Sequence, residues 1–415
     1  MTGRLPWFGR SGGGRRRDEV ARIGSGPAPE PAPAPGAVEA ELAAHRIRSV
    51  ASALYALLAG EAGNLLLSPY SVAAALGMLA RGSAGATHQE FFRLVHDEDD
   101  LGPRWYRSIA AHLTHPGAVL EPAIGMFAQH GSRWLPAFTA DLVEHYGAPL
   151  REVDFARDPH GARRTINDWA AEHVGPAHAQ LLGPSWVTAL DRLLIVSTLR
   201  LDAGWSQALE VDPVPRPFRR GRPSAELLVP MLRGPVRART RTGAGWRSIS
   251  LPMTGGLAAT IIVPDSDSLI AVERDLAAQR LTTFLPRAPD RVVELRMPTL
   301  RLHAHLSLRA AFTALGLESV FTENADLSRM SLEEPVRLSG LRHALDITLD
   351  EHGIRTGAPG TTARPPAHGP ESSGRPDEEF AVDRTFVLVV HDERLLTTLL
   401  VARVEDPLGD RDPAP

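Results

Sequence analysis

The chain has 415 residues, no cysteine, a net charge of −4 and a hydrophobic share of 43%, which is ordinary for a folded domain. The lack of cysteine excludes disulfides, thiolate metal sites and thiol nucleophiles, so stability has to come from an apolar core. The nearly balanced charge gives no indication of a nucleic-acid or anionic-membrane partner, and no apolar run reaches the roughly 20 residues that span a bilayer.

The positive side chains other than histidine are all arginine, because the chain contains no lysine. Together with abundant Ala, Gly and Pro, this is typical of a GC-rich bacterial coding bias. No apolar stretch follows the arginines near the N-terminus, so a secretory signal would lack its hydrophobic region. We therefore expect a cytoplasmic protein, unless the start codon is wrongly assigned and hides a signal.

Both ends of the chain are predicted to be disordered. Residues 1–37 combine a glycine run, an arginine run and a Pro-Ala stretch, a composition that buries too little apolar surface to offset the entropy of ordering. Residues 408–415 are predicted to form a second, C-terminal tail. Residues 38–407 then form a single domain.

The first half of this domain is predicted to be mainly helical. Apolar residues recur at helical spacing over residues 38–60, which indicates an amphipathic helix. A short apolar strand follows at residues 65–67, and Ser68 with Pro69 is typical of the start of the next helix. A further helix is predicted over residues 163–182.

The second half is predicted to be mainly strands. Residues 193–201 are almost continuously apolar, as in a strand buried on both faces, and residues 258–263 and 292–302 predict two more strands. Residues 386–390 and 395–404 predict a closing hairpin. Helices early and strands late favour an α+β domain with large, mostly antiparallel sheets. Residues 353–379 lack any periodicity, and so long a loop in a compact domain is usually functional or disordered.

Short motifs are spread over the whole domain in a fixed order. They are Asn64 with Ser68-Pro69-Tyr70-Ser71, Gly82 to Thr87, Ile166-Asn167-Asp168-Trp169, Leu201-Asp202-Ala203-Gly204-Trp205, Met297-Pro298-Thr299-Leu300, Ala325-Asp326-Leu327-Ser328, His343, Asp350-Glu351-His352-Gly353, Phe386 and Asp406-Pro407. Together, and in this order, they resemble the signatures of the serpins, the serine protease inhibitor family. The resemblance implies a serpin fold, with large mostly antiparallel sheets, surrounding helices and an exposed reactive loop at residues 351–386.

The resemblance also implies a function. In serpins a target serine protease cleaves the loop as a substrate, and the N-terminal half of the loop inserts as a new strand into the main sheet. The protein itself is then not an enzyme, and we expect a monomer without cofactor or metal. Serpins place a hydrogen-bonding cluster that gates this movement beneath the main sheet, here matched by Asn64, Ser68, Ser71, Ser197 and His343. Trp205 matches a structural tryptophan of the core.

The hinge of the loop both follows and departs from the family pattern. The matching residues are Glu351, Gly353, Ile354, Thr356, Ala358, Pro359 and Gly360. Alternation along an inserted strand turns Ile354, Thr356, Ala358 and Gly360 inward. The bulk of Ile354 is expected to cost about 1–3 kcal/mol. Pro359 has no N–H for a sheet, and its unpaired partner would cost roughly 1–3 kcal/mol if buried.

The scissile bond is predicted near Ala367 and His368, about seventeen residues after the hinge glutamate, as in inhibitory relatives. Arg364 and Arg375 are each followed by proline, which suits a scissile bond badly and disfavours a trypsin-like target. We therefore expect an elastase- or subtilisin-like protease as the partner.

Three classes of function remain open. The first is protease inhibition, and the second is a non-inhibitory serpin that serves as a binding or structural module because Ile354 and Pro359 hinder insertion. A hydrolase is a distant third, because no nucleophile, base and oxyanion site emerge together. His303 and His305 alternate on a strand and could share a metal, but packing histidines are favoured because no further ligand is evident.

Overall fold

The computed structural model describes residues 36–95, 103–113, 116–173, 179–221, 226–278, 280–286, 290–331, 336–356 and 376–409, which belong to one compact unit. The predicted N-terminal tail up to residue 35 and residues 410–415 lie outside these ranges, and so does the loop segment 357–375. Leu408 and Gly409 were predicted to belong to the C-terminal tail, but both amides bond to Asp406, at 3.0 Å and 3.2 Å. The described part of the chain therefore extends two residues beyond Pro407.

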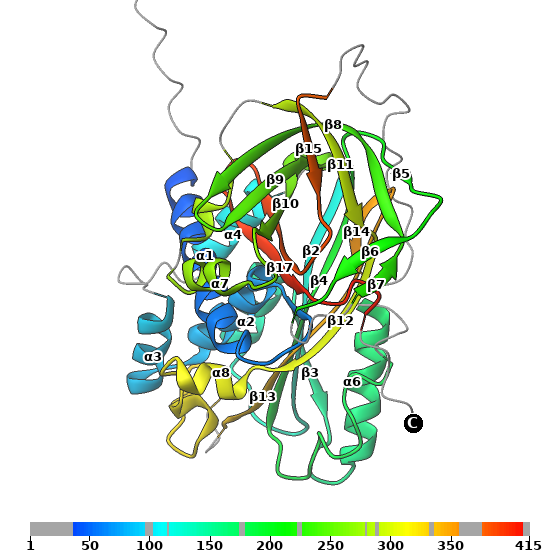
Figure 1. The fold of residues 1–415 in the computed structure, drawn as a ribbon. Helices are drawn as coiled ribbons and strands as arrows, with labels where there is room; N and C mark the ends of the chain where they lie inside the picture. Colours follow the sequence, from blue (N-terminus) through cyan, green and yellow to red (C-terminus); the bar gives the residue numbers. More distant parts are fainter. Residues whose placement is uncertain are drawn as a thin grey trace, which may run out of the picture. The chain divides into compact units, whose positions relative to one another are not determined.

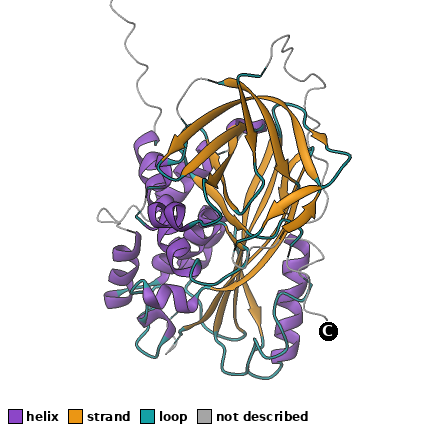
Figure 2. Cartoon of the chain, in the orientation of Figure 1, coloured by secondary structure: helices purple, strands orange, loops and turns teal. Residues whose placement is uncertain are grey.

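The fold contains both helices and strands (Figure 2), and they are interleaved along the chain. The helices are α1 (Ala37–Leu58), α2 (Pro69–Gly82), α3 (Gly85–Val95), α4 (Pro103–His112), α5 (Pro136–Tyr146), α6 (Pro159–His173), α7 (Ile270–Ala277) and α8 (Arg309–Ala314). None of the helices in the described ranges combines the length and apolar composition that crossing a bilayer requires.

Two large sheets organise the strands. The six-stranded one, which we call the main sheet, has the order β12-β13-β14-β4-β2-β3, and the nine-stranded second sheet has the order β1-β17-β16-β10-β9-β8-β11-β15 with β5 beside β8. The main-sheet strands are β2 (Ala118–Gln129), β3 (Leu150–Val153), β4 (Leu193–Gly204), β12 (Leu300–Ser307), β13 (Leu338–Asp350) and β14 (Gly353–Thr356). The second sheet has β1 (Leu65–Leu67), β5 (Glu210–Val211), β8 (Met231–Gly243), β9 (Trp246–Pro252), β10 (Leu257–Pro264), β11 (Arg291–Pro298), β15 (Glu378–Ala381), β16 (Phe386–Asp392) and β17 (Thr398–Val404), and β6 (Arg216–Arg219) pairs separately with β7 (Glu226–Val229).

Both faces of the main sheet are covered by apolar side chains. Helix α6 lies beside the main sheet (Figure 1). On this face Leu194 and Val196 pack with Ile166 and Trp169 of α6, and the Trp169 ring lies 5.7 Å from that of Phe127. The other face belongs to the central core, which α1 and α2 share with the second sheet. Because β4 is buried on both sides, its nearly continuous apolar run is explained.

Most elements lie where the sequence predicts them. The first helix is α1, and Ser68 caps α2 by accepting the amide of Ser71 at 3.2 Å, with Pro69 in the first turn. The predicted closing hairpin is the antiparallel pair β16 and β17. The mixed content and large, mostly antiparallel sheets confirm the predicted α+β class.

Two predictions about element bounds are wrong. Residues 292–302 form two strands instead of one, because the chain leaves the second sheet after Pro298 and enters the main sheet at Leu300. Thr299 makes the crossing, with its amide bonded to the Pro230 carbonyl at 3.0 Å. Helix α6 begins at Pro159, before the predicted start, and the described residues 179–182 are not helical.

Candidate functional site

The predicted hinge begins with a sharp reversal at the end of β13. Glu351 and His352 form a turn, and β14 then runs back antiparallel to β13. Gly353 has φ +142°, and a Cβ built there would lie 2.1 Å from the carbonyl oxygen of Ala203. Only glycine fits this position, because any other side chain would collide with the backbone of β4.

The hinge is already a strand of the main sheet. β14 pairs with β13 from Asp350 and Gly353 to Ile347 and Thr356, and its other edge pairs with β4. Away from the hinge, β13 and β4 pair with each other directly and in parallel, from Leu338 and Leu193 to His343 and Ser197. The two strands therefore separate after this point, and β14 lies between their separated ends.

Ile354 and Thr356 point inward, as their alternation predicts. Ile354 is fully buried in the central core, opposite Ala203 on β4. Ala203 is buried in the same core, so the isoleucine that seemed costly in the sequence lies among apolar side chains. Thr356 is 6% exposed, and its Oγ1 accepts the amide of Leu201 at 2.7 Å.

Arg355 was not singled out from the sequence, although alternation puts it on the opposite face from its two neighbours. Its guanidinium donates to the carboxylate of Asp350, and it lies directly opposite Asp202 of β4. Burial raises the pKa of Asp202, and the positive charges of Arg355 and Arg200 oppose that rise. The arginine is thus the cation between carboxylates on the two strands that flank the hinge.

Four of the predicted gating residues come together near the point where β13 and β4 separate. His343 is fully buried on β13, and its Nε2 accepts the Ser68 amide at 2.9 Å. Nδ1 of the neutral ring therefore carries the proton and donates to Ser197 Oγ at 2.9 Å. Burial lowers the pKa of His343 to about 3. Ser71 completes the cluster through its bonds to Ser68.

Asn64 does not join this cluster, contrary to the prediction. Its side-chain oxygen accepts the amides of Glu405 and Asp406 at 2.8 Å and 2.9 Å, and its nitrogen donates to the Asp406 carbonyl at 2.9 Å. Both hydrogen-bonding functions of the amide are used at the end of β17. Asn64 therefore fastens the C-terminal strand.

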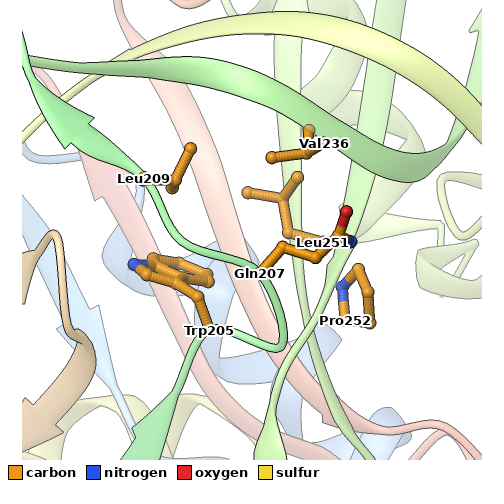
Figure 3. A pocket seen from close by; sticks show the side chains of 6 residues that line it. All are labelled: Trp205, Gln207, Leu209, Val236, Leu251 and Pro252. Carbon is orange, nitrogen blue, oxygen red and sulfur yellow. The ribbon is translucent and has the colours of Figure 1, made fainter. Parts of the chain in front are cut away.

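Trp205 lies in the core as predicted and also holds the hinge turn. Its Nε1 donates to the Asp350 carbonyl at 2.7 Å, and its amide donates to the His352 carbonyl at 3.3 Å. The ring borders a small cavity of about 10 Å³, whose other walls come from β8, β9 and the chain after β4 (Figure 3). Trp205 thus holds the turn between β13 and β14 in place through two hydrogen bonds.

Several of the remaining predicted site residues are not among the residues that the structure describes. Ala358, Pro359 and Gly360 of the hinge, and the predicted scissile pair Ala367 and His368, lie outside the described residues. At the far end of the loop, β15 pairs in parallel with β11 and Phe386 is buried in β16. β15 and β16 lie in the second sheet and β14 lies in the main sheet, so the loop connects the two sheets.

The alternative of a metal at His303 and His305 gains no support. The two rings lie 6.4 Å apart on β12, and His303 stands opposite Asp346 of β13. Within the described ranges, no three histidine, aspartate or glutamate side chains are grouped so as to hold a metal ion.

Comparison with known proteins finds one family. The model of the family described as "Serpin (serine protease inhibitor)" matches residues 45–407. The leukocyte elastase inhibitor of Bos taurus is 27% identical over 363 residues, which are 83% of this chain and 94% of that protein. Among solved structures, Serpin48 of the insect Tenebrio molitor has a TM-score of 0.75 at 20% identity, covering 88% of this chain and 98% of that one. Human thyroxine-binding globulin has a TM-score of 0.76 at 18% identity, covering 89% and 100%.

Proposed function

The chain belongs to the serpin family, and from this premise we propose that it is a suicide-substrate inhibitor of serine proteases. A protease cleaves the loop, and the loop's N-terminal part extends β14 down the main sheet before the acyl-enzyme is hydrolysed. The chain contributes no catalytic group of its own. Its role is to supply a substrate bond and a sheet that accepts a new strand.

The observation that carries this proposal is the position of β14 between β13 and β4. An inserted strand needs partners on both edges, and Gly353–Thr356 already has them. Counting on in the same register, Gly360 would meet His343 on β13 and Ser197 on β4. Further insertion would then have to part the hydrogen bond between these two side chains, which is the gating role that we assign to the cluster.

Pro359 is the residue that works against this movement. In the same register it would lie between Ala344 and Thr198, where a central strand needs an N–H that proline lacks. Insertion competes with deacylation, and each 1.4 kcal/mol on the insertion barrier slows it about tenfold. The proposal therefore predicts a leaky inhibitor, with some protease released after cleavage.

For the target we propose an elastase- or subtilisin-like serine protease, cleaving near Ala367 and His368. The bovine relative bears the name leukocyte elastase inhibitor, and proline after both loop arginines, Arg364 and Arg375, disfavours trypsin-like enzymes.

The test is to mix the protein with elastase-, subtilisin-, chymotrypsin- and trypsin-like enzymes and to look for a denaturant-resistant complex. We expect both a complex and cleaved protein with the first two enzymes, and a large rise in melting temperature of the cleaved form. Loop cleavage that yields neither a complex nor such a rise would overturn the proposal.

Pro359→Ala should raise the ratio of complex to cleaved protein by about tenfold, because it restores one sheet hydrogen bond. Pro370→Ala is the matched control, since it also removes a loop proline but lies beyond the predicted scissile bond. Equal effects of the two variants would show that general loop flexibility, and not the inserted strand, limits trapping.

A second candidate is a non-inhibitory serpin that serves as a binding or structural module. Pro359 favours it, and one solved relative, human thyroxine-binding globulin, is named for a small molecule that it binds. This candidate predicts cleavage without trapping by every protease, and no gain in trapping from Pro359→Ala.

A further inference from the structure

The outward face of the second sheet carries four charged side chains on three neighbouring strands. Strands β8, β11 and β15 lie side by side, and β15 is the far end of the predicted reactive loop (Figure 1). Alternation along β11 puts Leu295 in the central core, so the residues on either side of it point outward. The four outward charges are Arg233 of β8, Glu294 and Arg296 of β11, and Glu379 of β15.

The register of these strands places like charges next to each other. Arg233 lies directly opposite Arg296 in the antiparallel pair of β8 and β11, and Glu294 lies beside Glu379 in the parallel pair of β11 and β15. Neighbouring strands are about 4.8 Å apart, and like charges directly opposite each other destabilise a sheet. In the part of the chain that the structure describes, none of the four side chains takes part in an ion pair or a hydrogen bond that would relieve this repulsion.

Two further carboxylates lie near Arg233. Glu210 of β5 is opposite Arg233 on its other side, although no ion pair joins these two described residues. Asp212 is buried, and its carboxylate already accepts the Val214 amide at 3.1 Å and the Arg216 guanidinium at 3.0 Å. The arginine pair of β8 and β11 is therefore accessible to a partner from outside.

Exchanging two residues of β11 would pair all four charges. With glutamate at position 296 and arginine at position 294, Arg233 would face a carboxylate and Glu379 would face a guanidinium. Two cross-strand ion pairs would then replace two repulsive contacts, so the order that the chain has is the less stable one. Charges that are kept unpaired at a cost in stability indicate a binding surface.

We propose that Arg233 and Arg296 form a binding surface for carboxylates on the target protease, and that this surface selects among proteases by their charge. The inference rests on the proposed protease-trapping function for the identity of the partner. The loop leads directly into β15, Arg296 lies beside Ala381 of that strand, and Arg233 lies one strand further, so a protease held at the loop is tethered close to both. Neighbouring guanidinium groups suit carboxylates because each can donate two parallel hydrogen bonds.

The two glutamates narrow the choice of partner. Glu294 and Glu379 lie between the arginine pair and the loop, and they repel a protease surface that is acidic throughout. The partner that fits has basic side chains next to its acidic ones. Such a pattern brings the two proteins together faster and in one orientation.

The test compares the wild-type chain with the exchange variant Glu294→Arg/Arg296→Glu, which keeps composition and net charge. Its melting temperature should rise by about 1–3 °C, because two cross-strand ion pairs form. Association with a subtilisin-like protease whose catalytic serine is replaced by alanine should slow about tenfold at low salt, because the charges no longer match. Cleavage of the loop by the active protease, at concentrations of the chain below KM, should slow by the same factor.

Arg296→Gln and Arg241→Gln are the matched single variants. Each removes one exposed arginine, but Arg241 lies eight residues along β8 from Arg233, about 26 Å away. Arg296→Gln should slow association by about three- to tenfold, and Arg241→Gln should leave it at the wild-type rate. In 1 M salt all the variants should associate at one rate, because the charges are screened.

Two results would overturn the inference. One is an association rate that is the same for the wild type and the exchange variant with elastase-, subtilisin-, chymotrypsin- and trypsin-like enzymes alike. The other is an effect of Arg241→Gln as large as that of Arg296→Gln. Neither readout needs a trapped protease. A chain that is cleaved without trapping, and whose exchange variant associates more slowly, would refute the inhibitor proposal and keep this one, whereas trapping at an equal rate in both chains would do the reverse.

Discussion

Gly353 is the residue on which the reversal between β13 and β14 depends. Its φ of +142° is rare for other residues, and the carbonyl of Ala203 leaves no room for a Cβ. Positive φ and steric collision each lower the stability of a substituted protein, and a second glycine of the chain allows the two effects to be measured separately. Gly316 has φ +87°, but a Cβ there would meet nothing within 4 Å.

We predict that Gly353→Ala releases the hinge. It should lower the unfolding free energy by about 3 kcal/mol and abolish the protection of hinge amides, because conformational strain and collision add. Gly316→Ala should cost about 1–2 kcal/mol, from strain alone, and leave the hinge protected. Urea unfolding and hydrogen exchange measure the two effects. A protected hinge in Gly353→Ala would contradict this account of the reversal.

At this scale, the sequence allowed the direction of the hinge side chains to be predicted, but not the residues that surround them. Once the serpin resemblance places the hinge on an inserted strand, alternation along that strand predicts that Ile354 and Thr356 point inward. The strand partners of Ile354 and Arg355 on β4 are Ala203 and Asp202, each some 150 residues away. A single sequence does not reveal such pairings, because register between distant strands is set by the whole fold.

At the scale of elements, His343 joins the start of α2, strand β4 and strand β13. It accepts from Ser68 and donates to Ser197, so the neutral ring with a proton on Nδ1 satisfies both contacts. A second buried histidine, His391 on β16, bonds to Thr260 of β10 at 2.9 Å. Burial lowers the pKa of His343 to about 3 and that of His391 to about 4.

These two histidines predict a loss of stability in mild acid. The unfolded chain binds a proton at each below about pH 6.5, whereas the folded protein does not until pH 4 or lower. The stability that these two histidines contribute is therefore fully present above about pH 6.5 and is lost as the pH falls towards 4. The raised pKa of Asp202 and Asp346 acts in the opposite direction, because there the folded form binds the extra protons.

We expect the unfolding free energy in urea to drop by about 2–3 kcal/mol between pH 7.5 and pH 5.5. His391→Gln should remove about half of this drop, because glutamine can still bond to Thr260 but does not titrate. An unfolding free energy that stays level over this range would mean that the two histidines are charged or exposed in the folded protein.

Elements marked by local chemistry were predictable, and those set by distant partners were not. The Ser68 and Pro69 start of α2 and the hairpin of β16 and β17 follow from local patterns. β14 has only four residues and lies in a stretch without periodicity, so nothing local marks it as a strand. The break at Thr299 was missed because strand-like alternation of apolar and polar residues continues on both sides of it. Only the phase changes, with apolar residues at odd positions before the break, as in Leu295, and at even positions after it, as in Leu302.

At the scale of the whole molecule, the loop insertion that we propose would take place beneath a covering segment. Residues 179–192 follow α6, and Leu181, Leu182 and Val187 pack with α6 over the main sheet. The Arg342 guanidinium of β13 lies 4.3 Å from the centre of the Trp186 ring. Arg342 directly follows Leu341 in the region where β13 pairs with β4, so a strand that extends past His343 must disturb this contact.

We predict that Trp186→Ala makes trapping more efficient. A cation–π contact is worth about 1 kcal/mol, so its loss should raise the ratio of complex to cleaved protein by about fivefold. Trp186 is 37% exposed, and the core should therefore keep most of its stability. Leu190→Ala is the matched control, since Leu190 lies in the same segment, is 70% exposed and should leave the ratio unchanged. Titration against a subtilisin-like protease, read on denaturing gels, measures the ratio. If Trp186→Ala left the ratio unchanged or lowered it, the covering segment would not be part of the insertion barrier, and the barrier would then have to lie within the sheet, at Pro359 and the bond between His343 and Ser197.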